Sequence, residues 1–319
     1  MSQLPDGVQR VDLDGADTRR LAVLVEAIET HDNPPYRTSP DEIDRWFRPH
    51  SGSRCSGWVA AGELIAYAHV QPRSMDAGVI TCQGGVAPHW RDRGLGEASS
   101  QWQTATATRI LRESPGGGGR IVTHVEGENT RFEAHVSRLG YTRSHTYEEW
   151  TRPLSLPLED YTVPSTIDVT MWRDELSDKV RRALNQMGET LGATPLSADQ
   201  WLETMSAFLP EASVVALDRS SDRSPVVGFL IASIYSQDWD ALGQRQGYID
   251  MYGLDGEHQG QGIVRAMITE AVRSFTALGL DTVAISSADT EAAARQLLRD
   301  LGFDVASVSH EYILDVEPA

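Results

Sequence analysis

The chain repeats itself, and this duplication constrains its fold more strongly than any other feature of the sequence. Three pairs of segments match in the same order and at nearly the same separation. They are residues 85–96 with 253–264, residues 139–141 with 301–303, and residues 144–147 with 309–312, at offsets of 168, 162 and 165 residues. A period of that length is the size of one ordinary domain. We therefore expect two domains of one fold, at residues 1–153 and 166–319, joined by a linker at residues 154–165.

Local patterns predict the linker and the elements of each half. Residues 152–166 contain three prolines and no sustained hydrophobic periodicity, which is typical of a connecting segment. Each half reads as a mixed α/β domain, with a central sheet flanked by helices. The expected helices cover residues 18–30, 40–47, 95–112 and 130–139, and then 174–191, 198–208, 263–278 and 290–301. The expected strands cover residues 58–61, 64–70, 79–86, 121–126 and the surroundings of Tyr147, and then 214–217, 226–235, 247–254, 282–286 and 312–316.

The net charge of −18 argues against nucleic acid as a partner, because phosphate binding requires a basic face. The charge is unevenly distributed: residues 1–155 carry a net charge of −3 and residues 156–319 a net charge of −15. A field of that sign favours cationic small molecules such as amines. It is equally typical of a surface that keeps a protein in solution, and the sequence leaves both explanations open.

Targeting and metal-binding patterns are not evident in the sequence. The first residues have neither the basic nor the apolar region of a signal peptide, and the most apolar stretch, residues 226–235, is too short to span a bilayer. We therefore expect a cytoplasmic protein with no membrane partner. The two cysteines, Cys55 and Cys82, lack metal-ligand spacing, so we expect partly buried thiols without a zinc site or a disulfide.

The strongest chemical signal is a strand that runs into the segment Arg91-Asp92-Arg93-Gly94-Leu95-Gly96, which a helix follows directly. The first turn of a helix offers N–H groups without an intrahelical partner and the positive end of the helix dipole, which suit a pyrophosphate. The glycines of this segment let the backbone approach the phosphates, and its two arginines add charged donors. The preceding Gly84-Gly85 pair predicts a β-bulge that exposes backbone groups to a ligand. Glycines alone would also fit a tight turn without a ligand.

This segment resembles the acyl-CoA pyrophosphate loop of the GNAT acetyltransferase superfamily, whose pattern is Arg or Gln, two residues, Gly, one residue, and then Gly or Ala. Residues 125–129 and Leu139-Gly140-Tyr141 are similar to that family's fifth-strand end and to the Gly-aromatic pair after the next helix. The resemblance covers both halves, and a tandem pair of this length is similar in architecture to the mycothiol synthases. It implies acetyl-CoA or another acyl-CoA as co-substrate, no metal, and an amine on a small molecule as acceptor.

The resemblance assigns cofactor contacts in both halves. The second loop departs from the family pattern, because Gln259 and Gly262 fit whereas Val264 stands where Gly or Ala is usual. The implied contacts are Val86, Arg91, Arg93, Gly94, Leu95, Gly96 and Asn129 in the first half, and Leu254, Gln259, Gln261 and Gly262 in the second.

The catalytic residues usual in this family are replaced here. A Tyr that acts as general acid commonly follows the Asn after the fifth strand by seven residues, and Val136 and Leu298 occupy those positions. A Glu on the fourth strand commonly acts as general base, and Ile80 and Tyr248 occupy its positions. Neither half therefore has the usual acid or the usual base.

Asp250 is the predicted general base. It and Cys82 stand two residues after the positions of the missing Glu, on the same face if the strands alternate regularly. Burial among like charges would raise the pKa of Asp250 towards a useful value. Tyr248 and Tyr252 would share its face and line the acceptor pocket or donate a proton. A carboxylate bonded to a neighbouring loop and aromatics in a core are the alternative interpretations.

Cys82 has no basic neighbour in sequence that would activate it, and His124 and His135 fit packing or surface roles better than catalysis. The sequence thus predicts an acyltransferase that moves an acetyl or other short acyl group from acyl-CoA to an amine, with the chemistry in the second half. Two alternatives stay open: a catalytically inactive acyl-CoA-binding protein with a regulatory role, and acetylation of a cysteinyl amine as in the mycothiol synthases.

Overall fold

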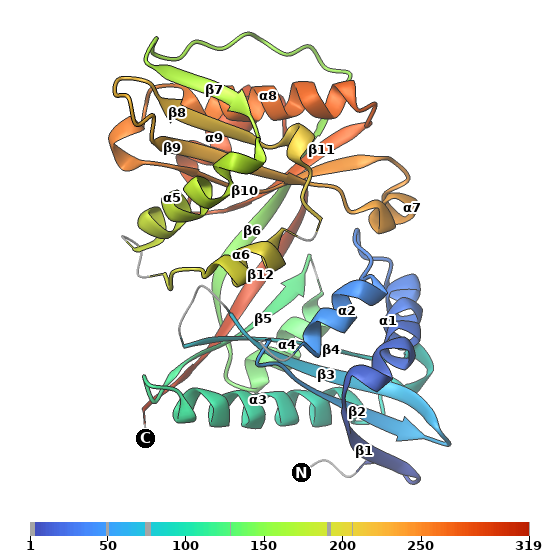
Figure 1. The fold of residues 1–319 in the computed structure, drawn as a ribbon. Coiled ribbons are helices and arrows are strands. Elements are labelled where there is room, and N and C mark those ends of the chain that lie inside the picture. Colours follow the sequence, from blue (N-terminus) through green and yellow to red (C-terminus); the bar gives the residue numbers. More distant parts are fainter. Residues whose placement is uncertain are drawn as a thin grey trace. The chain divides into compact units, whose positions relative to one another are not determined.

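The fold is described from a computed structural model, for residues 4–48, 51–73, 78–127, 129–189, 193–205 and 207–318 (Figure 1). The chain forms two compact units. The first unit consists of residues 1–144 and 310–319, and the second unit of residues 145–309. These units divide the chain at different places from the expected domains at residues 1–153 and 166–319, which remain our proposal for the duplicated segments.

The first unit contains a sheet in the order β1-β2-β3-β4-β5-β12. Strands β1 to β4 are antiparallel neighbours, and β4 and β5 run parallel. The strands are β1 (Val8–Leu13), β2 (Arg54–Ala60), β3 (Glu63–Pro72), β4 (Val79–Val86), β5 (Gly119–Glu126) and the C-terminal part of β12 (Asp304–Val316).

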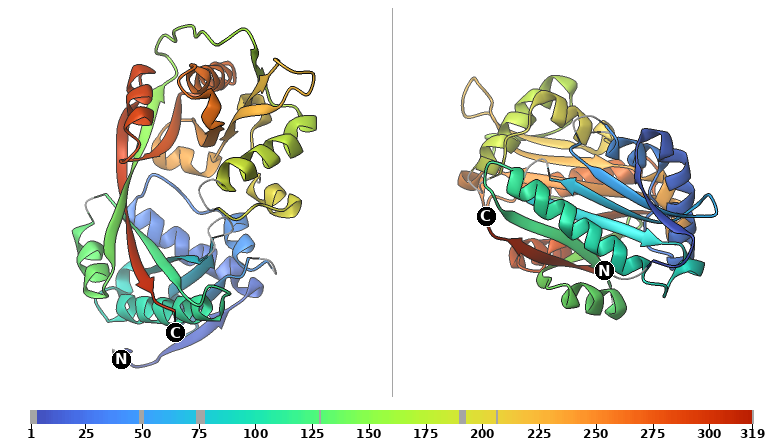
Figure 2. Two further views of the ribbon diagram at one scale, coloured as in Figure 1. Left: turned by 90° about the vertical axis from the view of Figure 1, so that its left-hand side faces the viewer. Right: turned by 90° about the horizontal axis from the view of Figure 1, so that it is seen from below.

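Helices cover both faces of this sheet. On one face α1 (Thr18–Asp32) and α2 (Pro40–Trp46) bury Leu21, Leu24 and Ile43 against Leu64 and Tyr67. On the other face lie α3 (Leu95–Glu113) and α4 (Thr130–Arg138), whose buried Leu111 and Val136 pack with Ile80 and Cys82 (Figure 2). Because adjacent strand residues point to opposite faces, Thr81 and Gln83 belong to the face of α1.

The second unit repeats this plan. Its sheet has the order β6-β11-β10-β9-β8-β7, in which β10 and β11 are parallel and the other neighbours antiparallel. The strands are β6 (Thr142–Pro153, from His145 onward), β7 (Ile167–Met171), β8 (Val214–Asp218), β9 (Val226–Ser233), β10 (Gln246–Leu254) and β11 (Thr282–Ala288). The helices are α5 (Ser177–Glu189), α6 (Ala198–Thr204), α7 (Trp239–Leu242), α8 (Ile263–Ala277) and α9 (Ala292–Asp300).

The closing strand of each repeat belongs to the unit that the other repeat builds. β6 ends the first repeat, yet it pairs with β11 from Pro153–Thr282 to Tyr147–Ala288 in the second unit. β12 ends the chain, yet Tyr312 and Val316 lie in the core of the first unit. Side chains on β6 are therefore available to a site in the second unit.

The mixed α/β architecture and most of the expected elements are confirmed. The strand that opens each repeat, β1 or β7, was not expected, and neither was the short α7. Both opening strands are short and at the edge of their sheets, where only one neighbour constrains the sequence. The ends expected for the helices at 174–191 and 198–208 include residues 190, 191 and 206, which lie outside the described residues.

Candidate functional site

The two strand-to-helix loops have the same backbone conformation. Each begins with a 3₁₀ turn, at Pro88–Trp90 and at Gly256–His258. Each ends with a glycine at positive φ that caps the helix, Gly94 at 82° and Gly262 at 78°. Two residues before it lies another positive φ, 64° at Asp92 and 75° at Gly260. The loops thus fold alike.

Both loops lead into a helix N-terminus, and they differ at the second residue of the helix, which is Gly96 in the first loop and Val264 in the second. The first intrahelical hydrogen bonds run from Ala98 N to Gly94 O and from Ala266 N to Gly262 O, both at 3.0 Å, so the three N–H groups before them have no acceptor within the helix. Apart from its own helix and chain neighbours, no atom of the described residues lies within 4 Å of the position that a Cβ on Gly96 would take. In the second loop Val264 occupies that place and packs on the core.

The two arginines of the first loop differ in availability. Arg91 donates from both terminal nitrogens to the carboxylate of Asp32, at 2.7 Å each, and from Nε to the carbonyl of Val86 at 3.2 Å. This side chain ties the loop to the end of α1. Arg93 is exposed, and its guanidinium lies over the ring of Trp90, 4.7 Å from the centroid. The expected phosphate contact therefore fits Arg93 better than Arg91.

In each unit two parallel strands separate at their C-terminal ends. The ladder of β4 and β5 runs from Val79–Arg120 to Thr81–Val122, and both strands continue beyond it. The ladder of β10 and β11 ends at Ile249–Ile285, and β10 continues to Leu254. Each pair therefore opens a gap in which a chain-like ligand can bond to the strand backbone.

The predicted β-bulge at Gly84-Gly85 is wrong. β4 keeps one register with β3 from Ile80–Pro72 to Val86–Ala66. These glycines serve close packing instead: a Cβ on Gly84 would lie 2.6 Å from the carbonyl oxygen of Tyr67. Of the two strands that precede the loops, it is β10 in the second unit that carries a bulge.

Asp250 is the extra residue of that bulge. Ile249 pairs with Ala232 and Met251 with the adjacent Ile231, so Asp250 has no partner residue on β9. β10 accordingly has 9 residues where β4 has 8. The constant sequence offset had implied that Cys82 and Asp250 are equivalent. They are not, because Asp250 has no counterpart in the first unit.

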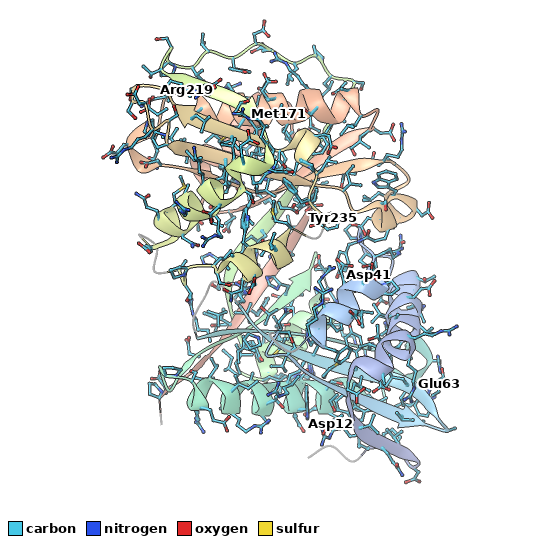
Figure 3. All side chains as sticks on the ribbon, in the orientation of Figure 1. Asp12, Asp41, Glu63, Met171, Arg219 and Tyr235 are labelled. Carbon is cyan, nitrogen blue, oxygen red and sulfur yellow. The ribbon has the colours of Figure 1, made fainter. Side chains whose placement is uncertain are left out.

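The Asp250 carboxylate is held by two hydroxyl groups. Ser233 donates to Oδ2, and Tyr235 donates to Oδ1 at 2.8 Å. Tyr235, labelled in Figure 3, follows the end of β9. Burial raises the pKa of Asp250 above its ordinary value, and the two hydrogen bonds lower it in part. The result is a partly buried carboxylate with an elevated pKa, as a general base requires.

Tyr248 lies on the same face, but its hydroxyl is engaged. It donates to Oε2 of Glu149 at 2.9 Å, and its ring meets that of Tyr235 edge-on at 6.0 Å. Burial, followed by the nearby carboxylate of Glu149, raises the pKa of Tyr248 well above its ordinary value. Burial likewise raises the pKa of Glu149. Tyr248 thus acts as a neutral donor that positions Glu149.

Tyr252 does not share this face, contrary to expectation. The extra residue at Asp250 shifts the alternation, so Tyr252 pairs with Leu230 and packs on the core beneath α8. Burial raises its pKa, and the nearby carboxylate of Glu291 raises it further. Tyr252 could therefore line a pocket or donate a proton only on the α8 side of the sheet, opposite to the face of Asp250. Leu254 also packs on that core.

The remaining candidates have defined contacts. Cys82 is buried, which raises the pKa of its thiol to about 12 and makes it a poor nucleophile. Asn129 caps α4 by accepting from Phe132 N at 3.1 Å, and Gln261 donates to the carbonyl of Glu257 at 3.4 Å. Gln259 is exposed, and Glu128, in the motif at residues 125–129, lies outside the described residues.

Two histidines of the first unit also have partners. Ser100 Oγ and His135 Nε2 are 2.9 Å apart, and His124 Nε2 lies 3.9 Å from Glu311. Across the described residues, no group of three or more His, Cys, Asp or Glu side chains could hold a metal ion. The helices in this part of the chain include none with the length and apolar character of a membrane span.

Three residues of the cluster around Asp250 were not predicted from the sequence. Ser233 and Tyr235 stand two apart at the end of an apolar strand, a pattern that could have marked them as a polar pair on one face. Glu149 carried no such signal, because β6 reads as the closing strand of the other repeat.

Comparison with known proteins shows what this chain resembles. Residues 181–303 match the model of the acetyltransferase (GNAT) family. The chain is 24% identical to a mycothiol acetyltransferase of Saccharomonospora viridis over 95% of this chain and 96% of that protein. It is 27% identical to a mycothiol acetyltransferase of Thermobifida fusca, over 78% of this chain and 77% of that protein.

Two solved structures share the fold over nearly the full length. A GCN5-related N-acetyltransferase from Sphaerobacter thermophilus has a TM-score of 0.77 at 20% identity and covers 99% of this chain and 98% of its own. A tandem GNAT protein from the clavulanic acid biosynthesis pathway has a TM-score of 0.71 at 15% identity and covers 98% of this chain and 99% of its own. A solved protein described as a tandem GNAT protein thus shares the fold over nearly the whole of this chain.

Proposed function

We propose that this chain works as a GNAT-type, acyl-CoA-dependent N-acyltransferase and transfers an acetyl group from acetyl-CoA to an amine of a small cationic acceptor in its second unit. The observation that carries this proposal is the position of Asp250. Its carboxylate stands on a bulge at the mouth of the gap between β10 and β11, among hydroxyl groups and without a counterpart in the first unit.

The acyl donor fits the gap and the loop together. The pantetheine arm of acetyl-CoA would bond to the strand backbone between β10 and β11, and its pyrophosphate would meet the N-terminus of α8 at Gly262. A bulge releases backbone groups from the ladder, and a freed N–H of β10 is the expected donor to the thioester carbonyl.

Asp250 would supply the base. An amine is protonated at neutral pH, and its lone pair becomes nucleophilic only when the ammonium loses a proton, here to the Asp250 carboxylate. The nitrogen then attacks the thioester carbon, the carbon–sulfur bond breaks, and the CoA thiolate leaves. The attacking nitrogen carries two protons; one stays on the amide, and the other passes to the thiolate or to water. A thiol has a pKa of about 8.5, so the thiolate leaves without a dedicated acid.

The first unit suits donor binding better than chemistry. Its loop is open at Gly96 and carries the exposed Arg93, whereas the strand positions next to its gap hold the inert Cys82. We propose that it binds acyl-CoA without transferring the acyl group.

A direct test measures release of free CoA from acetyl-CoA over a panel of small amines, amino sugars and aminoglycosides. Turnover with at least one amine, lost in Asp250→Asn, supports the proposal. Acetyl-CoA binding without release for every acceptor would favour an inactive acyl-CoA-binding protein instead.

A second candidate acceptor has specific support. Relatives named mycothiol acetyltransferase match up to 95% of this chain, so acetylation of a cysteinyl amine on a sugar conjugate is the alternative. Assaying that single acceptor beside the amine panel distinguishes the two, because a selective enzyme would convert one and leave the other.

A further inference from the structure

The exchanged strand β6 brings two adjacent glutamates into the second unit, and their surroundings differ. Glu148 is neutralised by Arg295, which donates to both carboxylate oxygens at 2.8 Å. Glu149 points to the opposite face and accepts a hydrogen bond from the Tyr248 hydroxyl at 2.9 Å. Glu148 is therefore structural, and Glu149 belongs to the face that carries Asp250.

On that face an exposed residue of β11 lies between β6 and β10. Glu149 pairs with Ser286 on β11, and Tyr248 pairs with Ala284, two residues earlier on the same strand, so these side chains share one side of the sheet. Ser286 is exposed between buried neighbours. A ligand lying over Ser286 would have Glu149 on one flank and the β10 residues on the other.

Glu149 and Asp250 differ from Glu148 in their ion pairing. Among the described residues, no basic side chain lies within ion-pair distance of Glu149 or Asp250. In the first unit, by contrast, Glu311 on the exchanged strand β12 is paired with Arg73 at 3.4 Å. Burying a carboxylate without a protein cation is costly, and a cationic ligand would offset that cost.

We propose that Glu149 binds a second cationic group of the acceptor, so that the substrate is a diamine or a similar polyamine rather than a monoamine. Asp250 faces the amine that is acetylated, and Glu149 holds the other. The rings of Tyr235 and Tyr248 lie beside these carboxylates and offer apolar and π surfaces to the connecting carbon chain. Tyr248 is a positioning residue, since its hydroxyl fixes the Glu149 carboxylate.

This inference rests on the proposed function, because it concerns the acceptor of the same site, and its test separates the two. Wild type, Glu149→Gln and Tyr248→Phe are titrated calorimetrically with a series of linear diamines and with butylamine as the matched monoamine. CoA release is measured on the same samples. Asp304→Asn removes an exposed charge from the same unit and controls for the general field.

We expect wild type to bind one diamine about ten- to hundredfold more tightly than butylamine, as a lost charge-assisted hydrogen bond predicts. Glu149→Gln should abolish that preference by raising the KM for the diamine with little change in kcat. Tyr248→Phe should reduce the preference, and Asp304→Asn should retain it.

Equal binding of diamines and butylamine by wild type, or a preference that survives in Glu149→Gln, would overturn the inference. Diamine binding that depends on Glu149 without CoA release would uphold it and refute the proposed function. If Glu149→Gln does not fold, a full preference retained in Tyr248→Phe would count against it.

Discussion

The two strand-to-helix loops of this chain share a backbone and differ in their side chains. Both have a glycine cap at positive φ, Gly94 and Gly262, after an equal 3₁₀ turn. The first loop is open at Gly96, whereas the second has Val264 there, packed on the core. The first copy thus retains the features of an anion site more fully.

In the strands before these loops, it is the second copy that has the polar, chemically useful side chain. β4 is regular, and its Ile80 and Cys82 face the core under α3 and α4. β10 has one additional residue, and that residue is the carboxylate Asp250. We propose that the two copies have diverged, the first towards holding a donor and the second towards acid–base chemistry.

The largest expected effect comes from Asp250→Asn. The substitution keeps the shape of the side chain and removes the base, so turnover should fall about 10²- to 10⁴-fold, the usual contribution of general base catalysis. Affinity for acetyl-CoA should change little, since the substitution leaves the loop and the strand backbone that would hold the donor in place. Steady-state CoA release and calorimetry measure the two quantities.

Cys82→Ala is the matched control in the first unit. Because its thiol is buried and inert, the variant should keep turnover within a few-fold of wild type. If Cys82→Ala abolished turnover while Asp250→Asn left it intact, the chemistry would lie in the first unit.

Gly96→Asp tests the other half of the comparison. No described residue beyond the helix itself obstructs a Cβ there, so the variant should fold, but its charge would face the pyrophosphate. Like-charge contacts cost several kcal/mol, so acetyl-CoA affinity at the first unit should fall about 100-fold or more. Turnover should stay within a few-fold of wild type if the second unit binds its own donor. Loss of turnover alongside affinity would mean that the first loop serves the reaction.

The pH dependence should show a smaller effect of known sign. Burial raises the pKa of Asp250 above 3.8, and the base works only when ionised. On acidification kcat/KM for the acceptor should therefore fall about tenfold per pH unit below that raised pKa. The measurement is a pH–rate profile at saturating acetyl-CoA. Persistence of the same acidic limb in the residual activity of Asp250→Asn would assign it to another group.

Much of the fold follows from local patterns in the sequence. Long elements with clear periodicity, such as α3 and α8, and apolar strands such as β4 and β9 were expected within a few residues. β1 and β7 were missed, because short edge strands carry a weak pattern. The exchange of β6 and β12 was also missed, since local hydrophobicity does not state which sheet a closing strand will join.

The candidate site was predictable only in part. Asp250 was identified from its place relative to the loop, but the bulge that it forms depends on pairing with β9 and has no local signature. For that reason the face assigned to Tyr252 was wrong. Glu149 was out of reach for a different reason, because it stands 99 residues from Tyr248 in the chain.

The smallest expected effect concerns α2 and α6, the second α-helix of each copy, which both begin with a serine capping box. Ser39 accepts from Glu42 N and Ser197 from Gln200 N, each at 3.2 Å, and the glutamate or glutamine side chain bonds back to the capping residue. Ser39→Ala and Ser197→Ala should each lower the free energy of unfolding by about 1 kcal/mol. Because β6 and β12 contribute residues to both units, we expect both substitutions to shift one common transition in urea denaturation. Two transitions, each moved by only one of the substitutions, would show instead that the duplicated units unfold independently despite their exchanged strands.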